Sequence, residues 1–407
     1  MRIDIGDKSK FSETIKELLD FNVMEKRVNG ISIDSRNLQN GDVFIAMKGD
    51  NIDSHNFINS KMESQTSLII NEVKSSKNII KVDSSKDILK KIAKRYREKM
   101  KCKVIGITGS NGKTTTKEIL HHILKSKYCT GMTVGNHNST IGMPMSFFSI
   151  STSNDIFIAE MGTNSIGEIK YLSEVAQPDV GVITNISEAH IQNFNSVNDI
   201  YNEKNELFKS LKKGGIAFIN MDDPYISTTR LSSNIKIIRY GFQNRFEYFG
   251  DINNSEEGSF FINDYKIETK HSSINLMKNI LVAFSIASEL GITLKEFNQN
   301  ISSFNIPNGR GKIIYKNKYL IIDDTYNSNF TSTVSGICSL KNKEYNNMRK
   351  VIVLGDMLEL GQRANKFHEN LLEHIIESKI DKVLLYGDLM KSLHEKARDV
   401  VGLSVNH

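Results

Sequence analysis

Short apolar runs alternate with polar, helix-favouring segments along the chain from about residue 98 onward. Apolar runs at 103–108, 155–161 and 179–186 predict strands, and the segments between them favour helices. This alternation is typical of a parallel sheet that is covered by helices on its faces. We therefore predict an α/β fold with a parallel sheet for this region.

The alternation begins again after about residue 308, with strands predicted at 318–323, 350–355 and 382–387 and helices between them. This pattern indicates a second domain of the nucleotide-binding, Rossmann-like type. Before residue 98 the pattern is less regular. There, strand-like runs precede a basic, helix-favouring stretch; the runs are 30–33 and 42–47, and the stretch is 86–101.

Three domains follow from these patterns. We place them at residues 1–97, 98–307 and 308–407, and we find no internal repeat. Residues 305–310 contain a proline and a glycine, which interrupt both neighbouring patterns, so this segment is the predicted hinge.

Composition changes this picture little. The chain has 407 residues, 39% of them hydrophobic and 25% charged, with a net charge of +6. The lysines are scattered among acids, so we do not expect nucleic-acid binding. We see no apolar run long enough for a membrane span and no secretory signal. Three widely spaced cysteines suit a reducing cytoplasm and argue against structural zinc.

The first predicted strand runs into a glycine-containing turn that ends in Gly112, Lys113 and Thr114. Glycines let backbone N–H groups approach an anion, a lysine supplies charge, and a threonine hydroxyl can bind Mg²⁺. Ile107 stands where the common P-loop spelling has its first glycine. We interpret the turn as a phosphate-binding loop with a less common consensus sequence. The alternative is a chance glycine turn before a helix.

Two further polar residues lie where predicted strands end. Glu160 closes the strand at 155–161, and His190 follows the strand at 179–186. In parallel sheets such ends meet at one edge, so Glu160, His190 and Thr114 are expected to converge on a Mg²⁺ or Mn²⁺ site. Taken singly, Glu160 could be a solvated strand end and His190 a structural histidine.

Together these segments resemble the Mur ligase family, ATP-dependent amide-forming enzymes of peptidoglycan precursor synthesis. Residues 108–114 match its loop T-G-[ST]-x-G-K-[ST], and residues 184–190 match its T-N-[IV]-x-x-x-H. Glu160 matches the family's magnesium glutamate. Lys204, by itself an ordinary surface lysine, stands where the family carries a lysine that becomes carbamylated.

The resemblance covers essentially the whole chain and is strongest to members that add D-alanyl-D-alanine to UDP-N-acetylmuramoyl-tripeptide. Further segments carry it: 33–36, 41–49, 136–144, 323–329 and 353–361. Two positions depart from the family pattern: Ser139 replaces an asparagine, and Asn275 replaces a histidine. Members usually continue for several tens of residues past the position of His407, so we expect either that the sheet of the third domain lacks an edge strand or that this chain is a truncated form.

The resemblance implies ATP and two Mg²⁺ ions as cofactors and an acyl-phosphate intermediate. Lys113 would bind the β- and γ-phosphates, Thr114 and Glu160 the first ion, and His190 with carbamylated Lys204 the second. The full set of implied nucleotide-binding residues is Thr108, Gly109, Ser110, Asn111, Gly112, Lys113, Thr114, Thr115, Asn279, Arg310, Asp324 and Asn327.

Residues outside the phosphate loop have plainer alternatives. Arg310 would reach the γ-phosphate as the domains close, or it is a hinge arginine paired with a surface acid. Asp324 and Asn327 would contact ribose or dipeptide, or they form an Asx turn. Acceptor contacts are implied for Asp34, Ser35, Arg36, Asn136 and Asn138, the first three of which could be a plain turn. His368 is a helix-face residue with a weak case for the dipeptide site.

The implied architecture is a small UDP-binding α/β domain, a central P-loop ATPase domain and a C-terminal Rossmann-like domain. The predicted enzyme is cytoplasmic, and nothing in its sequence requires more than a monomer. Alternatives within the fold are the ligase that adds the third peptide residue and a folylpolyglutamate synthase. Outside it they are a non-catalytic nucleotide-binding homologue and a general P-loop kinase or NTPase.

Overall fold

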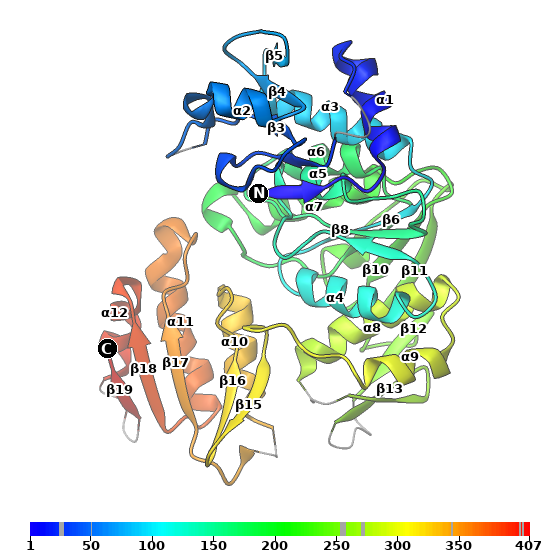
Figure 1. Cartoon of the computed structure of the whole chain (residues 1–407). Coiled ribbons are helices and arrows are strands. Elements are labelled where there is room, and N and C mark those ends of the chain that lie inside the picture. Colours follow the sequence, from blue (N-terminus) through cyan, green and yellow to red (C-terminus); the bar gives the residue numbers. More distant parts are fainter. Residues whose placement is uncertain are drawn as a thin grey trace.

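The computed structural model describes residues 1–23, 28–49, 51–252, 258–269, 273–342, 345–398, 400 and 403–407. An N-terminal part (blue) covers one side of a central part (cyan through green to yellow-green), and a C-terminal part (deeper yellow to red) lies beside the central one (Figure 1). Within the described ranges, no helix has the length and hydropathy that a membrane span needs.

The N-terminal part contains a sheet of order β1-β2-β3-β4-β5. β1 pairs antiparallel with β2, and the other neighbours pair in parallel. The predicted runs at 30–33 and 42–47 are therefore confirmed as strands of this sheet. Its strands are β1 (Arg2–Asp4), β2 (Gly30–Ser32), β3 (Val43–Ile45), β4 (Leu68–Asn71) and β5 (Ile79–Lys81).

The central sheet has the order β14-β13-β12-β11-β10-β9-β6-β8-β7. It is parallel from β12 to β7, as predicted, and the β12, β13 and β14 pairs are antiparallel. The sequence prediction missed this antiparallel extension. The strands are β6 (Lys103–Thr108), β7 (Thr130–Met132), β8 (Ile156–Glu160), β9 (Val180–Ile183), β10 (Ile216–Asn220), β11 (Lys236–Gly241), β12 (Tyr248–Asp251), β13 (Ser259–Ile262) and β14 (Tyr265–Glu268).

Helices pack on the sheets of all three parts. The predicted helical stretch at 86–101 is α3, which Ser84 caps through its contact with the Asp87 N–H. The helices are α1 (Lys8–Leu19), α2 (Ser60–Gln65), α3 (Ser85–Glu98), α4 (Lys113–Leu124), α5 (Gly142–Phe147), α6 (Glu168–Ala176), α7 (Val197–Lys209), α8 (Ile274–Glu289), α9 (Leu294–Ile301), α10 (Phe330–Ser339), α11 (Ala364–Glu377) and α12 (Lys391–Ala397).

The C-terminal part differs from the single parallel sheet that the alternation predicts. The expected strands are present, but β16 forms an antiparallel hairpin with β15, whereas β17, β18 and β19 form a separate parallel sheet. The hairpin is favoured by its two-residue loop, in which Asn317 has a φ of 54°. The strands are β15 (Lys312–Lys316), β16 (Tyr319–Asp323), β17 (Val351–Gly355), β18 (Lys382–Tyr386) and β19 (Ser404–Asn406).

An apolar cluster joins the central and C-terminal parts. It contains Ile186 and Ile191 from the loop after β9, and Met357 and Leu360 from the loop after β17. All four side chains are buried. Burial of apolar surface contributes about 25 cal/mol per Å², so this cluster holds the two loops against each other. The domain boundaries stay predictions.

Candidate functional site

The phosphate loop lies between β6 and α4, where the sequence places it. Gly109 has a φ of 147°, and a Cβ atom there would lie 1.9 Å from Thr184 Oγ1. Gly112 has a φ of 82°, and its Cβ would lie 2.4 Å from Asn279 Oδ1. Both positions therefore need glycine for backbone conformation and for space. Asn279, expected at the nucleotide, packs directly against the loop.

The loop is also tied to the segment after β9. The Asn111 N–H donates to Asn185 Oδ1 (3.0 Å), and Asn185 Nδ2 donates to the Asn111 carbonyl (3.0 Å). The Ser110 hydroxyl bonds to Ser187, and the Thr108 hydroxyl donates to the Met161 carbonyl. The side chains of Thr108 and Ser110 thus hold the loop, and the Ser110 N–H is itself bonded to the Asn185 carbonyl at 2.9 Å. Thr115 is buried on α4.

Lys113 folds back over the loop. Its Nζ donates to the carbonyls of Gly109 (2.7 Å) and Ser110 (3.3 Å). Burial lowers the pKa of Lys113; the charge of Glu160 opposes this shift and the charge of Arg310 adds to it. The ammonium therefore lies in a poorly solvated place where an anion would stabilise it.

Glu160 at the end of β8 is 1% exposed, so the alternative of a solvated strand end is wrong. Its Oε1 accepts hydrogen bonds from Thr114 Oγ1 (3.0 Å) and Asn138 Nδ2 (2.8 Å). Its Oε2 lies 3.2 Å from Lys117 Nζ and has no hydrogen-bond partner of good geometry. Thr114 and Glu160 thus converge as predicted.

Lys117 is a functional candidate that the sequence reasoning missed. Its side chain is fully buried, and its Nζ donates to the carbonyls of Thr133 (3.0 Å) and Gly135 (2.7 Å) besides facing Glu160. It lies one helical turn after Lys113, so the two lysines share a face of α4. The sequence signal that could have found Lys117 is this spacing. Residues four apart lie on the same face of a helix, so an inward-pointing Lys113 predicts that Lys117 also points inward.

Lys204 lies on α7 and is 2% exposed. The alternative that it is an ordinary surface lysine is therefore wrong. Burial and the nearby charge of Lys113 hold the pKa of Lys204 well below its usual range, against the opposing charge of Glu203. Glu203 is itself buried and accepts from the N–H groups of Gly167 (2.7 Å) and Ile169 (2.6 Å) at the start of α6. Lys204 is therefore a buried lysine whose neutral form is favoured more than in a solvated lysine.

His190 follows β9 in a left-handed conformation, with a φ of 59°. Its Nδ1 contacts the Glu359 carboxylate from the C-terminal part. Burial lowers the pKa of His190, and the charge of Glu359 opposes that shift. The charges of Lys113 and Lys204 also act on the ring, so these three side chains lie within electrostatic reach. The sequence reasoning missed Glu359, which comes from another part of the chain.

Arg310 reaches across to the phosphate loop, and among the described residues it has no carboxylate within ion-pair distance. Its Nη2 lies 3.2 Å from Thr114 Oγ1, and its guanidinium stacks on the Tyr326 ring at 3.8 Å. Burial raises the pKa of Asp324, and the charge of Arg310 opposes that shift. The Asn327 side chain turns back to the Ser328 N–H.

Two further contacts join the same parts. The amide groups of Asn111 and Asn329 bond reciprocally at 2.7 and 3.3 Å. The Thr331 hydroxyl donates to the Glu188 carboxylate at 3.2 Å. The phosphate loop is therefore bordered by residues of the C-terminal part on several sides.

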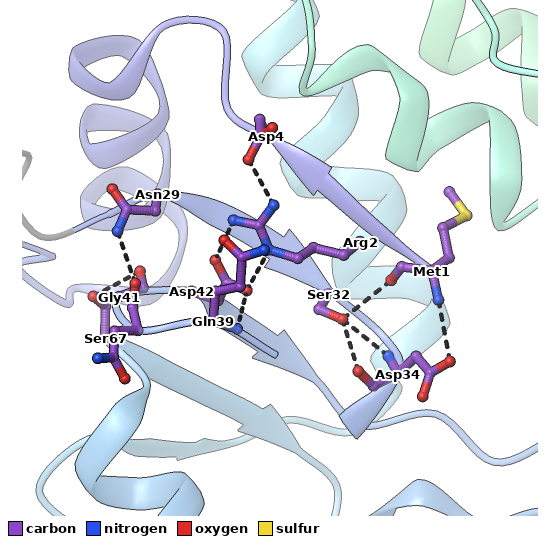
Figure 2. Close-up of polar contacts among 11 residues, drawn as sticks. Met1, Arg2, Asp4, Asn29, Ser32, Asp34, Gln39, Gly41, Asp42 and Ser67 are labelled. Carbon is purple, nitrogen blue, oxygen red and sulfur yellow. Dashed lines mark hydrogen bonds and ion pairs between the residues drawn. The ribbon is translucent and has the colours of Figure 1, made fainter. Parts of the chain in front are cut away.

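The predicted acceptor residues of the N-terminal part are held together by ion pairs. Arg36, which is 81% exposed, donates twice to Asp34 at 2.9 and 2.8 Å, and this holds the pKa of Asp34 well below its usual range. Beside it, Arg2 makes two bonds to the buried Asp42 at 2.7 and 2.9 Å (Figure 2). An open hollow lies here, lined by Arg2, Arg36, Asn37, Leu38 and Gln39.

Asp34 begins a short helical turn, Ser35–Asn37, by accepting from the Arg36 N–H, so the plain-turn reading describes the local geometry. Of the other predicted acceptor residues, Asn138 contacts Glu160, and Asn136 is exposed on the same loop. His368 is buried and does not present its ring to a dipeptide site. Its Nε2 accepts from the Met357 N–H, and its Nδ1 bonds to the Ala364 carbonyl.

The oxygen donors present fit a hard divalent ion. Glu160 offers a buried carboxylate with an oxygen that lacks a hydrogen bond, and Thr114 adds a hydroxyl 3.0 Å away. Among the described residues, no three His, Cys, Asp or Glu side chains cluster as a metal site. A second ion at His190 and Lys204 would therefore need a further anionic ligand, which a carbamate on Lys204 would supply.

Family comparisons agree with this geometry. Residues 107–287 match the Mur ligase middle domain, and residues 309–407 match the Mur ligase glutamate ligase domain. The chain belongs to the Mur ligase family, which confirms the resemblance predicted from the sequence.

Individual relatives narrow the resemblance. The chain is 33% identical over 384 residues to UDP-N-acetylmuramoyl-tripeptide–D-alanyl-D-alanine ligase of Bacillus subtilis, covering 91% of this chain and 82% of that protein. A MurF structure from Acinetobacter baumannii matches with a TM-score of 0.87 at 26% identity, covering 99% of this chain and 90% of the other. A MurF ligase from Thermotoga maritima in complex with ADP has a TM-score of 0.81 at 29% identity, covering 92% of each chain.

Replacing Gly109 by alanine tests the phosphate loop. We expect Gly109→Ala to weaken ADP binding about tenfold or more, because the new Cβ would push Thr184 and the loop apart. Titration calorimetry measures the affinity. Gly214→Ala is the control, since Gly214 has a φ of 79° but no atom within 4 Å of its Cβ position. Equal ADP affinities in the two variants would contradict this role of Gly109.

Replacing Lys117 by methionine tests the buried ion pair. Removing one partner of such a pair costs about 3–5 kcal/mol, so we expect the free energy of unfolding to fall by that amount. Magnesium with ADP should recover part of the loss, because the ion gives Glu160 a new counter-charge. Urea unfolding with and without both ligands measures this effect. Lys125→Met, at an exposed site beyond the same helix, is the control; equal losses in both variants would overturn the assignment.

Proposed function

We propose that this protein is an ATP-dependent ligase that joins D-alanyl-D-alanine to UDP-N-acetylmuramoyl-tripeptide in peptidoglycan precursor synthesis. One observation carries the proposal. The central and C-terminal parts bring Lys113, Thr114, Glu160 and Arg310 together around one phosphate loop, in a chain that resembles relatives of this activity over most of its length.

The reaction joins two fragments through an activated acid. The terminal carboxylate of the tripeptide attacks the γ-phosphorus of ATP, forming an acyl phosphate and releasing ADP. The amine of D-alanyl-D-alanine then attacks the acyl carbon, the amide bond forms, phosphate leaves, and the amine loses a proton. Two anions must approach in the first step, so neutralisation of negative charge is the main demand on the protein.

The cations around the loop meet that demand. Lys113 lies within the loop and would bind the β- and γ-phosphates, and Arg310 enters from the C-terminal part beside Thr114. The two side chains approach from different parts of the chain. Both charges would therefore surround the γ-phosphate only when the two parts are in contact, which would also exclude water from the acyl phosphate.

The metal ligands that the family resemblance implies lie around the same loop. Thr114 and Glu160 would hold a first Mg²⁺, and His190 with carbamylated Lys204 a second. When bound, these ions would neutralise charge on the phosphates and on the acyl carboxylate. The ligands present favour this use, since Thr114 and Glu160 offer oxygen and Lys204 is a buried lysine with a lowered pKa.

The acceptor nucleotide would bind at the N-terminal part. Arg36 carries an exposed guanidinium at the open hollow, and a guanidinium suits a diphosphate. Asp34 and Ser35 would fix the turn that presents it, and Asn136 and Asn138 would lie nearer the peptide end, next to Glu160. Three free cysteines are compatible with a reducing compartment. We infer that the enzyme acts in the cytoplasm as a monomer.

The proposed activity is tested by measuring phosphate release with ATP, Mg²⁺ and UDP-N-acetylmuramoyl-tripeptide, with and without D-alanyl-D-alanine. We expect release that needs both substrates and a pentapeptide product by mass spectrometry. Lys113→Ala, which removes the loop cation, should abolish both signals. Release that instead needs UDP-N-acetylmuramoyl-dipeptide and a diamino acid, or a folate with glutamate, would refute the proposal.

The carbamate is tested through its supply of CO₂. The neutral Lys204 amine adds CO₂ to give a carbamate and a proton, so the reaction requires deprotonated lysine. Because burial holds the pKa of Lys204 well below its usual range, a larger fraction of the amine is neutral at a given pH than in a solvated lysine, and this fraction falls as the pH is lowered. We expect CO₂-depleted buffer at pH 8 to lower the rate and bicarbonate to restore it.

A carbon-13 signal in the carbamate region after addition of labelled bicarbonate should accompany the recovery. Lys204→Arg should show neither the signal nor the recovery, since a guanidinium stays protonated. A wild-type rate that does not depend on bicarbonate, in protein that shows no carbamate signal, would contradict the modification.

A further inference from the structure

The segment after β17, residues 356–361, is held by several contacts, although Leu358 within it is exposed. Met357 and Leu360 are buried in the cluster that joins the central and C-terminal parts. The Met357 N–H donates to His368 Nε2 at 3.0 Å, and the Met390 N–H donates to the Asp356 carboxylate at 3.0 Å. These contacts fix the backbone on both sides of Glu359.

Glu359 is aimed at the central part by this backbone. It adopts a φ of 61°, and its own carbonyl accepts from the Gln192 N–H at 3.1 Å. Its carboxylate contacts Nδ1 of His190. One residue of the C-terminal part thus holds both the backbone beside His190 and the imidazole ring.

We propose that Glu359 is a positioning residue that makes His190 competent to bind a metal ion, and that it does so only when the C-terminal part is docked. This inference rests on the proposed function. A carboxylate beside Nδ1 holds the proton there, so the lone pair of Nε2 is left for the ion. Docking therefore completes the metal site, in addition to bringing Arg310 to the loop.

The geometry explains why the contact spans two parts of the chain. His190 lies in the loop after β9, and its position depends on the central sheet, whereas Glu359 moves with β17. If the parts separate, the imidazole loses its only described carboxylate contact, and the other tautomer becomes available. The nucleotide-binding loop would then be present without a complete second metal site. Phosphate transfer from ATP would therefore wait until the central and C-terminal parts are in contact.

The test compares Glu359→Ala and Glu359→Gln with a matched control, Glu188→Ala. Glu188 crosses the same interface but contacts Thr331, not His190. The control therefore removes an interdomain carboxylate and leaves the imidazole contact intact. Glu359→Gln keeps a hydrogen-bond acceptor and should retain much of the effect that Glu359→Ala removes.

The first readout is the histidine nitrogen spectrum of metal-free protein with nitrogen-15 in its histidines, at pH 8. His190→Gln identifies the His190 signals. We expect wild type and Glu188→Ala to carry the proton on Nδ1, and Glu359→Ala to shift the population toward Nε2. A wild-type ring protonated on Nε2, or a spectrum that Glu359→Ala leaves unchanged, would overturn the proposal.

The second readout is the binding of Mn²⁺ to the ADP complex, measured by electron paramagnetic resonance without turnover. Loss of a residue that orients a metal-binding histidine weakens metal affinity about 10- to 100-fold. We expect that loss in Glu359→Ala, and not in Glu188→Ala, at the Mn²⁺ site that His190→Ala removes. In a His190→Ala background, Glu359→Ala should have no added effect; an added effect of similar size would show that Glu359 acts independently of His190.

The proposed ligase activity and the role of Glu359 can be tested separately. If wild type shows no ligation with D-alanyl-D-alanine, the proposed function fails, whatever the histidine spectrum shows. If wild type ligates normally while Glu359→Ala matches Glu188→Ala in both readouts, only the role of Glu359 fails.

Discussion

A single buried carboxylate, Glu160, is the constraint on which the site depends. Moving an ionised carboxylate out of water is costly unless charge and hydrogen bonds compensate it. Here the compensation comes from Lys117 and Thr114 on α4 and from Asn138 on the loop after β7. The carboxylate therefore ties the end of β8 to the phosphate-loop helix and to the loop that carries the predicted acceptor residues.

The second constraint is that no one part of the chain contains the whole site. The apolar cluster that includes Ile191, Met357 and Leu360 holds the central and C-terminal parts together, and the polar contacts of Arg310 and Glu359 depend on that docking. Hydrophobic burial is non-directional, whereas these hydrogen bonds fix orientation. The cluster therefore supplies the attraction between the parts, and the polar pairs determine their register.

The sequence allowed prediction of those elements and site residues that local sequence patterns determine. The strands β6, β8 and β9 and the loop before α4 are visible in the sequence because apolar runs and glycines mark them. Thr114 and Glu160 could be paired because parallel strands end at one edge. Glu359 and Asn329 could not be found in this way, since their partners are 169 and 218 residues away in sequence. The β15–β16 hairpin was missed because apolar pattern alone does not distinguish antiparallel from parallel pairing.

The charge balance of the assembled site explains why these distant pieces belong together. Lys117 faces Glu160, whereas Lys113 lies over the phosphate loop and Arg310 reaches it from the C-terminal part. Burial is the main cause of the lowered pKa of Lys113, and repulsion by the charge of Arg310 adds to it. A polyphosphate would relieve that repulsion, and it would do so most where both cations are present. Ligand binding and docking of the C-terminal part therefore favour each other, because the same phosphate neutralises charges that each part supplies.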